Sequence, residues 1–254
     1  METRTELGWN RTGLQTSPLD AAALTDGATA LASQMDGLDD LEGRDDLQVR
    51  QAYASEADPL GSVPLPLTVT GVVKSGVDLL TGNRPQVLMD KLGERLAFER
   101  GGVRLYDSLL VKCRAMDSGL TVQRQAQLAM FRDQEAEHFA LVENALRDLG
   151  GDPTAQTPCA DLVGIKSQGL VQAMNDPRTS FLQSLHVMLD AELIDNAGWE
   201  LLIQLAGKAG HAAIAEQFTA ALEQEAQHLR TLRELVAELT LSDADATAEA
   251  LAGH

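Results

Sequence analysis

The chain has 254 residues, of which 44% are hydrophobic, and 38 Asp and Glu against 20 Lys and Arg give a formal net charge of −18. This length and hydrophobic content exclude wholesale disorder and allow a large buried core. The acid surplus argues against a nucleic-acid binder and against docking on anionic membranes, because both surfaces would repel the chain.

The number of cysteines and the residues at the N-terminus indicate the cellular compartment of the protein. Cys113 and Cys159 are too few for a disulfide framework or a four-thiolate metal site, so we expect a cytoplasmic protein with reduced thiols. No run of about eighteen apolar residues occurs and no apolar signal core follows Met1, so neither a spanning helix nor a secretory signal is expected. Abundant Ala and Leu with only 4% aromatic residues favour helices.

The N-terminal third differs from the rest of the chain. Residues 1–58 carry 12 acidic and 4 basic side chains with little apolar periodicity, which predicts a flexible acidic extension, either a solvated tail or a partner-binding segment. Residues 59–86 contain four prolines and the β-leaning run Leu67–Val73. They are expected to form a lead-in rather than a long helix.

From residue 87 to residue 240 the apolar periodicity is helical. Two short links and one long connection, Gly150–Arg178, separate four long segments. The long connection has a helical stretch of its own, Cys159–Met174, and residues 241–254 are expected to form a flexible tail. The predicted fold is all-α: a four-helix bundle of two antiparallel hairpins joined by a long crossover. The four segments are Val87–Lys112, Val122–Leu149, Thr179–Leu205 and Ala212–Leu239.

Each of these helices places a carboxylate in the middle of its apolar stripe, and two of them add a His three residues later. Isolated carboxylates in a core are very costly, and four meeting in one bundle would repel one another unless cations lie between them. Oxygen-rich ligation with one imidazole per ion suits iron or manganese better than tetrahedral zinc. The candidate ligands are Glu99, Glu135, His138, Glu192, Glu225 and His228.

This arrangement resembles the ferritin-like di-iron carboxylate superfamily, in which a Glu and a Glu-x-x-His lie on each of two helix pairs. The resemblance covers residues 87–240 and implies two iron ions per chain, with manganese possible. It further implies that Glu135 and Glu225 bridge the two ions. Glu99 and Glu192 would then be terminal ligands, and His138 and His228 would each bind one ion.

The sequence also gives predictions for other residues near the apolar stripes. Tyr106 resembles the first-helix tyrosine of ferritins and rubrerythrins, which implies a catalytic role beside a ligand carboxylate. Asp195 could be an extra ligand or a hydrogen-bond partner of a ligand His, and we favour the second. Glu200 is the reserve ligand if the third helix is rotated. The residues that flank the motifs, Gln134, Glu137 and Gln224, are expected to face solvent, and Gly101-Gly102 either packs helices closely or marks a kink.

The chain also departs from known subfamilies. It lacks the Cys-x-x-Cys pairs of a rubredoxin-type site, so the resemblance is to a ferritin- or rubrerythrin-like domain without the rubredoxin part, and the reductant would be external. The long lead-in argues against a 24-subunit cage, and a homodimer is expected instead.

The function implied by the resemblance is ferroxidase- or peroxidase-type redox chemistry with Fe²⁺ and O₂ or H₂O₂, in iron handling or oxidative-stress defence. One alternative is a non-catalytic, metal-stabilised stress protein. Another is a di-iron oxygenase that acts on an organic substrate.

Overall fold

The computed structural model describes residues 46–57, 63 and 85–252, and the chain divides into two compact units, Met1–Pro59 and Leu60–His254. Every regular element in the described part is a helix, as the sequence predicts. In the first unit, α2 spans Asp46–Glu56, although we expect the acidic extension to lack structure. This short segment has no Gly or Pro and is rich in helix-forming residues. The expected flexibility of residues 1–45 and the run Leu67–Val73 lie outside the described residues.

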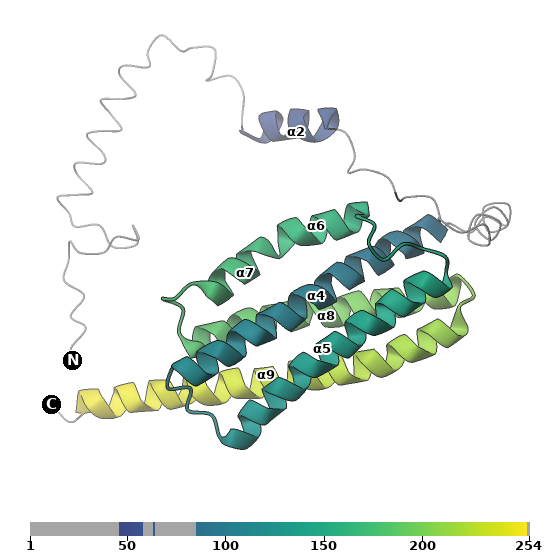
Figure 1. The fold of residues 1–254 in the computed structure, drawn as a ribbon. Helices are drawn as coiled ribbons and strands as arrows, with labels where there is room; N and C mark the ends of the chain where they lie inside the picture. Colours follow the sequence, from purple (N-terminus) through teal and green to yellow (C-terminus); the bar gives the residue numbers. More distant parts are fainter. Residues whose placement is uncertain (1–45, 58–62, 64–84, 253–254) are drawn as a thin grey trace, which may run out of the picture. The chain divides into compact units, whose positions relative to one another are not determined.

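The second unit is a four-helix bundle with a helical crossover (Figure 1). One hairpin pairs α4 with α5 and the other pairs α8 with α9, and the hairpins meet where α4 contacts α8 and α5 contacts α9. The crossover runs along α4 and α8 on the outside of the bundle. The helix bounds are α4 Pro85–Ala115, α5 Val122–Asp148, α6 Pro158–Lys166, α7 Gln168–Asn175, α8 Phe181–Lys208 and α9 Ala212–Ala252.

Local sequence signals explain several of the helix ends. Thr121 begins α5 by accepting a hydrogen bond from the Arg124 amide, and Ser180 begins α8 in a capping box with Gln183. Gly150 follows the end of α5 with a φ of 83°, a left-handed conformation that glycine adopts without strain. These signals set where α5 begins and ends and where α8 begins.

Three helix predictions need correction. The first helix begins at Pro85 rather than Val87, because proline fits the first helical position. The crossover carries two helices instead of one, with the break at Ser167. The last helix continues to Ala252 rather than ending near Leu239 ahead of a tail. Its sequence from residue 212 to 252 has neither Gly nor Pro to stop it.

The apolar core of the bundle has two parts. One cluster packs around Tyr106 and Phe131, and the other packs around Trp199 and Phe218. Between them lies a layer of fully buried charged side chains. None of the described helices is long and apolar enough to cross a membrane.

Candidate metal centre

All six predicted ligands come together in this buried polar layer. Each of the four long bundle helices contributes one carboxylate, and α5 and α9 each add the imidazole that follows three residues later. None of the six residues is more than 2% exposed. The 3.6-residue period that buries the apolar stripe therefore buries these polar side chains as well, at one level of the bundle.

The six residues form two overlapping groups, each with its ligand atoms within 4.8 Å of one another. Position 1 consists of Glu99, Glu135, His138 and Glu225, and position 2 consists of Glu135, Glu192, Glu225 and His228. Glu135 and Glu225 belong to both groups. Each position thus offers two shared carboxylates, one carboxylate of its own and one imidazole. Each of these donor sets could hold one cation, so the two positions together could hold a pair.

Buried oxygen and nitrogen atoms without hydrogen-bond partners support the interpretation that the cluster binds cations. Both carboxylate oxygens of Glu99 and of Glu225, and the Nδ1 atoms of His138 and His228, are buried and make no hydrogen bond within the described residues. His138 Nδ1 lies 2.5 Å from Glu225 Oε1, and His228 Nδ1 lies 3.1 Å from Glu225 Oε2. Buried polar atoms without partners are rare in proteins, and bound cations would satisfy these.

The pKa values of the clustered residues are shifted, because several acids lie close together in a core that excludes water. Burial and neighbouring carboxylates raise the pKa of Glu135 to about 8 and hold that of Glu225 well above its usual range. Burial lowers the pKa of His138 to about 4. Burial also acts to lower the pKa of His228, but the carboxylates of Glu135 and Glu192 outweigh it and raise the value to about 9. Bound cations would release protons from this cluster.

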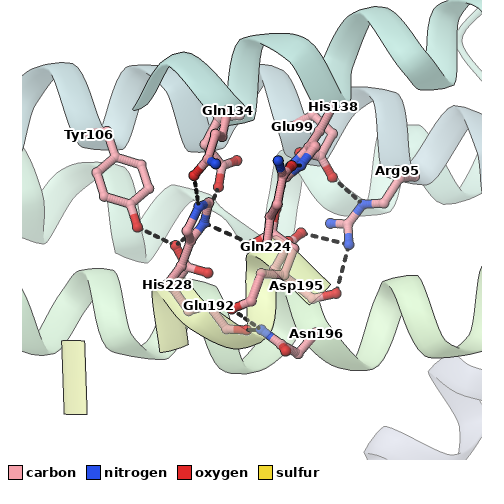
Figure 2. Close-up of polar contacts among 12 residues, drawn as sticks. Arg95, Glu99, Tyr106, Gln134, His138, Glu192, Asp195, Asn196, Gln224 and His228 are labelled. Atoms are coloured by element: carbon pink, nitrogen blue, oxygen red, sulfur yellow. Dashed lines mark hydrogen bonds and ion pairs between the residues drawn. The ribbon is translucent and has the colours of Figure 1, made fainter. Parts of the chain in front are cut away.

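Two glutamines hold the outer edges of the imidazole rings, as Figure 2 shows. His138 Nε2 donates to Gln224 Oε1 at 2.7 Å, and His228 Nε2 donates to Gln134 Oε1 at 2.8 Å. Each glutamine directly precedes the motif Glu of its own helix and reaches the His of the other hairpin. In a neutral imidazole a proton on Nε2 leaves the lone pair on Nδ1, where it could bind a cation.

The prediction that these glutamines face solvent is wrong, since both are half-buried and bonded to a ring. The available signal was the repeated pattern Gln-Glu-x-x-His, which occurs as Gln134–His138 and as Gln224–His228. Glu137 is exposed, as expected, and Glu200 is exposed and takes no part in the cluster.

Sequence reasoning missed Arg95, a buried arginine that is only 4% exposed. Its Nε lies 3.0 Å from Glu99 Oε1, and its Nη1 lies 2.6 Å from Asp195 Oδ1. Asp195 therefore pairs with Arg95 rather than with a histidine, and it belongs to neither group of candidate ligands. The pair is formally neutral, so it leaves four carboxylate charges for two divalent ions to balance.

Aromatic side chains close both ends of the cluster. The Tyr106 hydroxyl donates to Glu192 Oε1 at 2.5 Å, and its ring meets that of His228 edge-on at 6.1 Å between centroids. Trp199 meets the ring of His138 in the same way at 5.7 Å. These contacts exclude water and fix the orientation of the imidazoles.

The two adjacent glycines of α4 have different surroundings. A Cβ on Gly102 would collide with the carboxylate of Glu135, whereas nothing lies within 4 Å of a Cβ on Gly101. The helix is continuous through both residues. Because Gly102 has no Cβ, the Glu135 carboxylate can lie against the helix at this position.

Metal-free protein should lose stability as the pH rises from 6.5 to 8. A pKa raised by folding adds stability that is complete below the unfolded value and disappears as the pH climbs through the folded value. The raised values of Glu135, about 8, and His228, about 9, both place part of that loss in this window. The lowered pKa of His138, about 4, makes no difference there, because its effect is complete above pH 6.5.

Melting curves of chelator-treated protein at constant ionic strength test this expectation. The same protein saturated with Mn²⁺ is the control, because bound cations displace the protons and should remove the decline. A melting temperature of the metal-free protein that rises between pH 6.5 and pH 8 would contradict it.

Comparison with known proteins agrees with this geometry. The family model of the ferritin-like domain matches residues 91–238, which include all six clustered residues and both hairpins. No curated protein and no solved structure matches the chain. With the family match covering more than half of its residues, the chain belongs to the ferritin-like domain family.

Proposed function

We propose that this protein is a di-iron carboxylate oxidoreductase that uses O₂ or H₂O₂ in ferroxidase- or peroxidase-type chemistry, in iron handling or oxidative-stress defence. The observation that carries the proposal is the pair of four-residue groups that share Glu135 and Glu225. Shared carboxylates hold two cations close together, which is what a two-electron reaction at a metal pair requires. Manganese remains the alternative metal, since the donor set suits both.

The donor count leaves room for a small oxidant. Each position offers four protein groups, three carboxylates and one imidazole, and iron in such oxygen-rich sites accepts further ligands. When bound, two ferrous ions would supply the electrons that reduce O₂ or H₂O₂. The residues of the chain hold the ions, and the surrounding aromatic rings keep bulk water out.

Tyr106 is placed to assist this chemistry. Its hydroxyl is buried and hydrogen-bonded to the carboxylate of Glu192, and burial together with that carboxylate holds the pKa of the phenol well above its usual range. The phenol therefore stays protonated at neutral pH and keeps a proton beside position 2. Cys113 and Cys159 are the only two cysteines of this chain and cannot supply the four thiolates of a rubredoxin-type site, so the reductant would come from outside.

Anaerobic loading with Fe²⁺, followed by mixing with O₂ or H₂O₂ in a stopped-flow spectrometer, tests the proposal. We expect about two ions per chain and rapid growth of ferric absorption in the near ultraviolet. The Tyr106→Phe variant should bind the same amount of iron but react more slowly, because the phenol proton is lost.

The outcomes separate the proposal from its alternative. Iron that binds at two per chain but shows no ferric absorption after mixing would refute the redox function. It would favour a metal-stabilised, non-catalytic protein instead. Protein that binds no iron, manganese or cobalt would refute the metal centre itself.

A further inference from the structure

The two hairpins supply matching ligands but different neighbours. Each hairpin provides a Glu on its first helix and Gln-Glu-x-x-His on its second. The residue four positions before the first-helix Glu is Arg95 in α4 but Met188 in α8. The two terminal carboxylates, Glu99 and Glu192, therefore lie in unlike surroundings although their roles correspond.

The groups beside the two terminal carboxylates differ in charge. Glu99 Oε1 faces the guanidinium of Arg95 at 3.0 Å, whereas Glu192 Oε1 accepts a hydrogen bond from the neutral phenol of Tyr106 at 2.5 Å. Each terminal carboxylate thus has one oxygen that faces a side chain, Arg95 in an ion pair at Glu99 and Tyr106 in a hydrogen bond at Glu192. Only the group beside position 1 carries a positive charge. Asp195 makes the pair neutral as a whole, but the guanidinium is the group of the pair that contacts Glu99, so an incoming cation must compete with it for that carboxylate.

Arg95 cannot easily leave this place. Besides its ion pair with Asp195, its Nη1 donates to the Asp195 backbone carbonyl at 2.9 Å. Its guanidinium lies 4.6 Å from the ring centroid of Phe98 and 5.7 Å from that of Trp199. A Cβ on Gly198 would come within 2.5 Å of Nη1, so the glycine leaves the space that the guanidinium fills. The contact with Glu99 is a fixed part of the site.

We propose that Arg95 makes the two metal positions unequal, so that position 2 fills first and binds its ion at least about tenfold more tightly than position 1. This inference rests on the proposed metal centre. An ion at position 1 must share the Glu99 carboxylate with a cation, whereas an ion at position 2 shares Glu192 with a neutral hydroxyl. A weakly held ion at position 1 exchanges readily, which fits iron that enters as substrate and leaves after oxidation.

Titration of the metal-free full-length chain with Co²⁺ tests the order of filling. Bound Co²⁺ absorbs visible light, so binding can be followed without a reaction with O₂. Calorimetry and absorption should show two steps of one ion each, with dissociation constants at least about tenfold apart. His228→Gln should abolish the tighter step and His138→Gln the weaker one. Two ions that bind with equal affinity, or the reverse assignment of the steps, would overturn the proposal.

The cause is tested by the double variant Arg95→Met and Asp195→Asn. It removes both charges of the pair together, so no uncompensated charge stays buried, and Met is the residue at the corresponding position of α8. We expect the weaker step to tighten at least about threefold and approach the tighter one, which should change little. Unchanged steps in this variant would show that Arg95 is not the cause.

A matched variant and one control outcome complete the design. Tyr106→Phe removes the neutral donor at Glu192, so it should alter the tighter step and leave the weaker step as it is. If the wild-type protein binds neither Co²⁺ nor iron nor manganese, the metal centre is refuted. If it binds two ions with equal affinity, the metal centre stands and only the inequality fails.

Discussion

The Gly102→Ala variant is expected to bind metal about 10–100-fold more weakly than the wild-type protein, whereas Gly101→Ala binds it normally. The methyl group at residue 102 would occupy the space of the Glu135 carboxylate, which belongs to both metal positions. Residue 101 has open space around it, so its new methyl group touches nothing. Metal content after dialysis against limiting Mn²⁺, measured by elemental analysis, gives the result directly.

This pair of variants controls for helix propensity, because both replace a glycine of the same helix by alanine. In each case the change favours the helix by about 0.5–1 kcal/mol. Gly101→Ala should therefore melt slightly higher than the wild type. Normal metal binding by Gly102→Ala would mean that the Glu135 carboxylate does not need its place beside α4.

Glu135→Gln is expected to affect metal binding and stability in opposite directions. Loss of a shared carboxylate should prevent tight binding at both positions, so that the variant is purified almost without metal. The metal-free variant should nevertheless be more stable than the metal-free wild type by about 1–4 kcal/mol at pH 8, because an amide of the same shape replaces a buried acid. Metal analysis and urea denaturation of chelator-treated proteins provide the two measurements.

The exposed Glu137, two residues further along α5, supplies the matched control. Glu137→Gln should change neither metal content nor the free energy of unfolding, because its side chain is solvated in both states. A metal-free Glu135→Gln protein that is less stable than the metal-free wild type would indicate a structural carboxylate. Such a result would argue against an acid kept in the core for metal binding.

The sequence was sufficient for the fold and for the set of clustered residues because both follow from one period. A helix that repeats every 3.6 residues places Glu99 among the leucines of its stripe, and the same holds for the other five. Helix ends were less predictable. At the C-terminal end of α9, for example, no glycine or proline stops the helix after residue 239.

The other residues of the site could not be predicted from the periodicity of a single helix. Arg95 lies one turn before Glu99, but its partner Asp195 is a hundred residues away, so only the packing of α4 on α8 explains why a charged residue is buried there. Gln134 and Gln224 lie beside the stripes, and their long side chains reach histidines of the other hairpin. Contacts between hairpins are set by tertiary structure, which no local period encodes.

The divided core has a consequence for how long each molecule survives. The two apolar clusters are separated by a layer of acids at which the hairpins meet, so a chain without metal is held together least well at its middle. Local opening exposes backbone to proteases, and a bound ion that favours the closed form lowers the population of the open form. If the proposed centre binds metal, the amount of this protein in cells should therefore follow the metal supply even at constant synthesis, because the metal-free form is degraded faster.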